Sequence, residues 1–109
     1  MRVLIIRPLE VPVVKDISGT LESMQETVGG LIQAVYPFED SAALICNDEG
    51  KLMNLPMNRH VPEMRDVIYG TFFLCNAPPD ADHFTSLTEE QIKQYTQRFA
   101  IPELFLLRR

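Results

Sequence analysis

The chain has 109 residues, of which 46% are apolar and 23% are charged, values that are typical of a globular protein and not of a disordered one. This length suits a single domain with its own core, so we expect residues 1–109 to form one domain. Fifteen acidic residues against ten basic ones give a net charge of −5, which argues against direct nucleic-acid binding. A DNA mimic is disfavoured because acidic and basic residues are interleaved.

The first third of the chain predicts two strands, a helix and a third strand. Residues 3–6 are a continuous apolar run, and residues 12–17 are expected to pair with it antiparallel. Thr20 is suited to cap a helix, and Gly29 is suited to end it in the left-handed conformation. Residues 31–38 alternate between apolar and polar side chains, which indicates a half-buried strand.

The middle of the chain predicts a hairpin followed by one long strand. Residues 42–47 are apolar enough for a buried strand, and the "NDEG" sequence at 47–50 is typical of a tight reversal. We therefore expect a β-hairpin there. Residues 64–76 form the strongest remaining strand signal, with Gly70 marking a bulge or a close approach of another segment.

The last third predicts a loop and a second helix. Two consecutive prolines keep residues 77–84 out of regular structure. Thr88 and Gln91 have the spacing of a capping box, and three apolar residues form one stripe of the helix that follows, namely Ile92, Tyr95 and Phe99. Pro102 ends the helix, and residues 103–109 are expected to form an edge strand or an extended tail.

These elements define an α+β fold with a single domain, in which a mostly antiparallel sheet of about 4–6 strands carries two short helices on one face or at one end. Cys46 and Cys75 lie within predicted strands, so we expect two buried, reduced thiols. The N-terminal apolar run is too short for a secretory signal, and no segment is long enough to cross a bilayer. A cytoplasmic location is therefore expected.

Residues 45–62 combine several polar side chains with two prolines, Pro56 and Pro62, which stiffen the backbone. The candidate ligand- or partner-binding residues there are Lys51, Asn54, Asn58, Arg59 and His60. An arginine offers a bidentate fork to an anion, and an asparagine both donates and accepts hydrogen bonds. The other interpretation is structural: the asparagines flank turns and the charged side chains point into water. The sequence leaves both interpretations open.

Other chemistry has weaker support. Asp80, Asp82 and His83 lie within four residues, but no further ligand at a defined spacing completes a metal site, so we predict no metal and no cofactor. No catalytic motif or phosphate-binding glycine loop is present, and apolar neighbours raise the pKa of a thiol, which disfavours a cysteine nucleophile. We therefore predict no catalytic residues and favour a protein that is not an enzyme.

Four segments carry a resemblance to a known family. In chain order they are "GTLESMQETVGGLIQAV", "ICNDEGKLMNLPMNR", "IYGTFFLCN" and "FTSLTEEQIKQYTQRFAIPE". Together they resemble the small bacterial proteins grouped as domain of unknown function 3846. The resemblance implies a setting on plasmids, conjugative elements or phages, often beside antirestriction genes, but it implies no activity. It marks residues 47–59 as the most recognisable stretch.

Two classes of function follow. The first is a non-catalytic interaction protein of a mobile genetic element, which binds a protein partner and has a role in modulating host defence. The second is a protein that binds a small anionic ligand, such as a nucleotide, through Lys51, Arg59 and the two asparagines. Neither class involves a membrane, and both are compatible with a monomer or a homodimer.

Overall fold

A computed structural model describes residues 1–105 of the chain as an α+β fold, which confirms the predicted class. Five antiparallel strands form the central sheet in the order β2-β1-β7-β4-β3. Their bounds are β1 (Arg2–Ile6), β2 (Val13–Asp16), β3 (Ile32–Val35), β4 (Ala42–Asn47) and β7 (Phe72–Asn76). A second sheet contains β5 (Met57–Val61) and β6 (Asp66–Tyr69). The helices are α1 (Leu21–Val28), α2 (Glu89–Arg98) and the short 3-10 helix η1 (Pro62–Met64).

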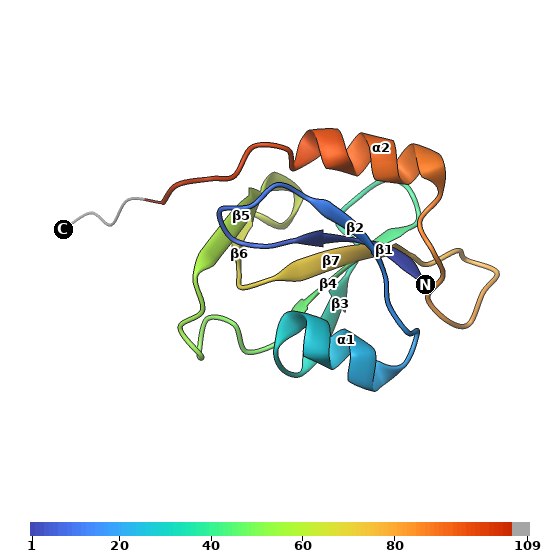
Figure 1. The fold of residues 1–109 in the computed structure, drawn as a ribbon, viewed down its shortest axis with the longest axis horizontal. Helices are drawn as coiled ribbons and strands as arrows, with labels where there is room; N and C mark the ends of the chain where they lie inside the picture. Colours follow the sequence, from blue (N-terminus) through green and yellow to red (C-terminus); the bar gives the residue numbers. More distant parts are fainter. Residues whose placement is uncertain (106–109) are drawn as a thin grey trace.

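The two α-helices cover opposite faces of the central sheet (Figure 1). Helix α1 packs Met24 and Val28 against one face, where Phe73 lies at the centre. On the other face, α2 and the second sheet share a core with Leu44 and Phe72. The expectation that both helices lie on one face or at one end is wrong. The helices lie on both faces because the central residues of β1, β4 and β7 are apolar on both sides of the sheet. Both faces therefore need to be covered.

Both helices begin as their sequences predict. The hydroxyl of Thr20 accepts a hydrogen bond from the backbone N–H of Ser23, and Gly29 ends α1 with φ = 78°. In α2, the backbone N–H of Thr88 donates to Gln91 Oε1 at 2.9 Å, and the N–H of Gln91 donates to Thr88 Oγ1 at 3.1 Å. The capping box is therefore confirmed.

The predicted hairpin after β4 is wrong. Strand β4 pairs with β3 and β7, while the next strand, β5, pairs with β6 in the other sheet. Residues 48–54 form a series of turns between the two sheets instead of a tight reversal within one. The turn residues of "NDEG" do form a turn. However, β4 pairs with the apolar strand β7, which is distant in sequence, and not with the strand that follows the turn.

The predicted strand over residues 64–76 is two strands in two sheets. Gly70 separates β6 from β7 and has φ = 85°, a left-handed conformation. A Cβ atom placed on Gly70 would lie 2.7 Å from Leu55 Cδ1, which confirms the predicted close approach. Gly70 is thus the point where the chain passes from one sheet to the other.

Gly70→Ala is expected to destabilise the fold by about 2 kcal/mol, because alanine disfavours a positive φ and its methyl group meets Leu55. Urea denaturation followed by circular dichroism measures this loss. Gly19→Ala is the matched control, since its Cβ would have no atom within 4 Å and its φ is not left-handed. Equal stabilities for the two variants would contradict this role of Gly70.

The two cysteines are buried free thiols on adjacent strands, as predicted. Cys46 on β4 belongs to the core under α2, and Cys75 on β7 belongs to the core under α1. Since their side chains point to opposite faces of the sheet, they cannot form a disulfide with each other.

After α2, residues 103–105 form no strand, so the described part of the C-terminal segment is extended. The carboxylate of Glu103 accepts a hydrogen bond from the backbone N–H of His60 at 3.1 Å, which holds this segment against β5. Residues 106–109 of the predicted tail lie outside the described residues. Within residues 1–105, neither helix has the length and apolar character that a membrane span requires.

Candidate functional site

The structure divides the five candidate residues of the 45–62 segment into a buried pair and an exposed group. Asn58 and Arg59 are 0% and 1% exposed. Lys51, Asn54 and His60 are exposed. The five side chains therefore do not converge on one surface, and a binding role for them together remains a prediction that this geometry does not favour.

Asn58 holds three parts of the fold together. Its side-chain amide donates to the carbonyl oxygens of Ile6 and Gly70, each at 2.9 Å. Its Oδ1 accepts a hydrogen bond from Arg59 Nη1, also at 2.9 Å. The side chain thus joins the end of β1, the passage between the sheets and β5.

Arg59 is a buried cation that binds backbone carbonyls. Its Nη2 donates to the carbonyl oxygens of Glu10 at 2.7 Å and Phe99 at 3.1 Å. Burial lowers the pKa of the guanidinium, and the carboxylate of Glu103 opposes that shift. Its Nε is buried without a hydrogen-bond partner among the described residues. Arg59 therefore connects the turn after β1 and the end of α2 to the second sheet.

The exposed candidates have separate surroundings. Lys51 Nζ donates to both carboxylate oxygens of Asp66, at 2.7 and 2.8 Å. Asn54 adopts a left-handed conformation with φ = 56°, which suits a turn residue. His60 points outward from β5. Lys51 also lines a cavity within the described residues.

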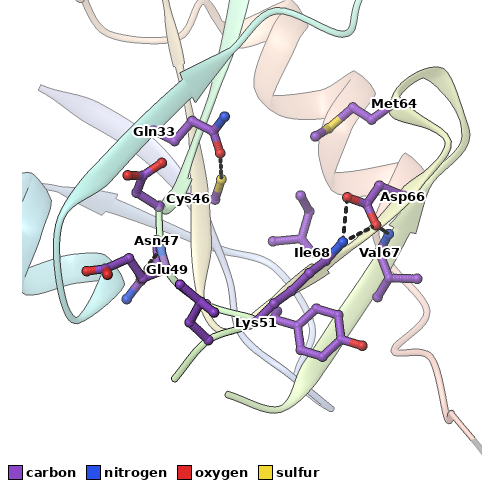
Figure 2. Close-up of a pocket in the computed structure, with 13 residues that line it drawn as sticks. Gln33, Cys46, Asn47, Glu49, Lys51, Met64, Asp66, Val67 and Ile68 are labelled. Atoms are coloured by element: carbon purple, nitrogen blue, oxygen red, sulfur yellow. Dashed lines mark hydrogen bonds and ion pairs between the residues drawn. The ribbon is translucent and has the colours of Figure 1, made fainter. Parts of the chain in front are cut away.

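That cavity, which we call the Lys51 pocket, lies between the central sheet and β6 and has a volume of about 240 Å³. Figure 2 shows Gln33 and Cys46 on one wall and Met64, Asp66 and Val67 on the other. The residues that complete its lining are Asn47, Asp48, Glu49, Gly50, Lys51, Leu52, Ile68 and Tyr69.

The segment of residues 48–54, which we call the 48–54 loop, is ordered by its own hydrogen bonds. Asn47 Oδ1 accepts from the backbone N–H of Glu49 at 2.8 Å. The N–H of Met53 donates to the carbonyl of Glu49 at 2.8 Å, and the N–H of Leu55 donates to that of Gly50 at 3.0 Å. These bonds order the backbone of the loop, and its residues 48–52 line the Lys51 pocket.

Carboxylates dominate the charge of the Lys51 pocket. Asp48, Glu49 and Asp66 line it, with Lys51 as the one cation among its lining residues. The hydrogen bond from Lys51 lowers the pKa of Asp66, so this carboxyl group is ionised at neutral pH. Burial, together with the nearby carboxylates of Asp48 and Asp66, raises the pKa of Cys46 to about 11. The thiol in the pocket is therefore protonated at neutral pH and is a poor nucleophile.

The described residues also lack a cluster suited to a metal ion, since no three side chains of His, Cys, Asp or Glu come together within residues 1–105. In the loop 77–84, His83 Nδ1 lies 2.8 Å from Asp82 Oδ1, and both side chains are exposed. The arrangement of the Lys51 pocket favours non-covalent binding, with its acidic rim as the main chemical feature.

Lys51→Met is expected to raise the pKa of Asp66 toward its ordinary value of 3.8, because the side-chain hydrogen bond from Lys51 is the largest cause of its depression. A depressed carboxyl pKa contributes stability above the unfolded pKa, and this contribution disappears as the pH falls through the folded pKa. Both side chains are about half exposed, so the stability change at pH 7 is expected to stay below about 1 kcal/mol. NMR titration of the Asp66 carboxyl carbon measures the shift. An unchanged pKa would contradict the pairing.

Sequence reasoning missed most of the Lys51 pocket. Asp66 is 15 residues from Lys51 and lies on a different element, so no spacing pattern connects them. Gln33 comes from an edge strand of the other sheet. A signal existed only for the 48–54 loop, where charged residues interrupt an apolar sequence.

The fold and the pocket define a small α+β domain whose central antiparallel sheet is covered on both faces and whose Lys51 pocket has an acidic lining. The chain belongs to the family described as domain of unknown function DUF3846, whose model matches residues 1–100. This confirms the resemblance found in the sequence. No curated protein and no solved structure shows a significant match to the chain.

Proposed function

We propose that this protein is a cytoplasmic, non-catalytic binding protein of a mobile genetic element, and that it captures a protein partner at the Lys51 pocket and the 48–54 loop. The setting on a mobile element, and with it a role in modulating host defence, rests on the family resemblance. The binding surface rests on the geometry of the loop and the pocket.

The observation that carries this proposal is the presentation of Leu52. Leu52 is 85% exposed, although it belongs to the 48–54 loop, whose backbone hydrogen bonds hold it in place. Met53, beside it, is half exposed. Apolar side chains on a preorganised loop are suited to enter a partner surface, because little conformational entropy is lost on binding.

The charge of the pocket indicates the chemistry of the partner. Asp48, Glu49 and Asp66 lie beside Leu52 with only Lys51 to balance them. A complementary segment therefore carries a lysine or arginine next to apolar residues. A small anion, the ligand of the second functional class, would meet net repulsion in this pocket, and the buried guanidinium of Arg59 is not accessible to it.

A peptide-display selection tests the proposal. Wild-type protein is expected to enrich peptides with a basic residue beside apolar ones, and synthetic copies are expected to lose at least tenfold in affinity for Leu52→Asp and for Glu49→Lys. Asp80→Lys is the matched control, since it adds the same charge change on an exposed loop outside the pocket. Enrichment of acidic peptides, or equal binding by all variants, would contradict the proposal.

A further inference from the structure

The two edges of the central sheet differ in how well they are protected. Edge strands expose unpaired backbone groups, and proteins commonly block them with proline or charged side chains. Strand β2 forms one edge and β3 the other. Their hydrogen-bonding patterns show which residues of each strand face outward.

On the β2 edge the outward positions are blocked. The backbone N–H of Ile17 donates to the carbonyl of Met1 at 2.9 Å, so Ile17 directs its backbone groups toward β1. By the strand register, Lys15 opposite Val3 does the same. Since antiparallel pairs alternate, the intervening residues Val14 and Asp16 face outward, as does Pro12, which has no N–H. A proline, a carboxylate and the neighbouring Lys15 therefore guard this edge.

On the β3 edge the outward positions are unguarded. The N–H of Asp48 donates to the carbonyl of Leu31 at 2.8 Å, so Leu31, Gln33 and Val35 direct their backbone groups toward β4. The backbone groups of Ile32 and Ala34 face outward. The β4–β7 ladder supports this assignment, because the N–H of Ala77 donates to the carbonyl of Ser41 and the alternation along β4 is consistent.

The same edge also lacks charge and exposes apolar side chains. Residues 27–38 contain no charged residue. Leu31 and Tyr36, at the two ends of β3, are 56% and 62% exposed. Among the described residues, no hydrogen bond beyond the β4 ladder reaches the backbone of Ile32 or Ala34. This edge therefore has the backbone donors and acceptors, the neutrality and the apolar flanks that an added strand requires.

We propose that the occupant of this edge is a second copy of the chain, paired antiparallel along β3 with Ala34 opposite Ala34 on a two-fold axis. A strand with outward Ile32, Ala34 and Tyr36 is self-complementary in this register, since each Ile32 then faces the partner's Tyr36. Such an aromatic and β-branched pair is favourable across strands, and residues 27–38 bring no charged side chain into the paired segment. The dimer would join two five-stranded sheets into one, and this proposal does not depend on the proposed binding function.

Ala34→Cys tests the register directly. Paired Cα atoms at a hydrogen-bonded antiparallel position lie about 5.5 Å apart, within the range of about 4.4–6.8 Å that a disulfide spans. Mild oxidation is expected to cross-link most of this variant into a dimer on a non-reducing gel. Lys15→Cys, on the guarded β2 edge, and the wild type, with its buried cysteines, are expected to stay monomeric on the same gel. Cross-linking of Lys15→Cys to the same extent as Ala34→Cys would overturn the proposal.

Sedimentation equilibrium of the full chain gives an independent test. The wild type is expected to reach twice the monomer mass, and Ala34→Pro is expected to remain monomeric, because it removes an N–H that is unpaired within the protomer. Circular dichroism checks that this variant is folded; if it is not, the cysteine cross-links decide. A wild type that stays monomeric up to about 1 mM would overturn the proposal.

Discussion

Arg59→Glu is expected to unfold the domain. The substitution places a carboxylate where the guanidinium donates to the carbonyls of Glu10 and Phe99, and near the carboxylate of Glu103. An uncompensated buried charge costs about 3–5 kcal/mol. The free energy of unfolding of a typical domain is about 5–15 kcal/mol, so at the low end of that range this cost removes most of the stability. Circular dichroism at pH 7 is expected to show loss of the native spectrum at 25 °C.

Arg59→Met gives the graded version of this experiment. It keeps the apolar stem, but five oxygen acceptors lose a donor, while the burial of a charge and of the unpaired Nε is relieved. The two effects partly offset, so we expect a loss of about 2–3 kcal/mol by urea denaturation. His60→Gln, at the neighbouring exposed position, is expected to change stability by less than about 0.5 kcal/mol. If Arg59→Met were as stable as His60→Gln, the buried hydrogen bonds of Arg59 would have no net effect.

Asn58→Leu is expected to cost about 3 kcal/mol. A leucine of similar volume cannot donate to the carbonyls of Ile6 and Gly70, nor accept from Arg59, so three buried polar groups lose their partner. Urea denaturation measures the loss. Asn54→Gly is the matched control, because Asn54 is exposed, has a left-handed backbone and makes no side-chain hydrogen bond within the described residues. We expect it to retain wild-type stability, and equal losses in both variants would contradict the role of Asn58.

These expectations change how binding experiments on this protein should be designed. Substitutions at Asn58 and Arg59 test the fold, so loss of binding in them would report unfolding and not a lost contact. Leu52 and Glu49 are exposed at the rim of the Lys51 pocket, so their substitution leaves the core intact. Binding and stability are thus separable only at the exposed end of the segment.

Features that depend on neighbours in the chain are predicted correctly from residue types alone. The capping box of Thr88 and Gln91 and the left-handed end of α1 at Gly29 are local, so their residue types predict them correctly. The same holds for the apolar runs that become β1 and β4, since continuous burial needs only a continuous apolar sequence. The α+β class follows from these elements.

Contacts between segments far apart in the chain decide which strands pair and which polar side chains are buried. Strand β4 does not form the predicted hairpin because its two edges pair with β3 and with β7, a fully buried strand about 30 residues later. Arg59 is buried because carbonyls 49 and 40 residues away in the sequence come within hydrogen-bond distance of it. No local pattern encodes such distant acceptors, so an arginine between turns has the same signature whether it binds a ligand, points into water or holds the fold together.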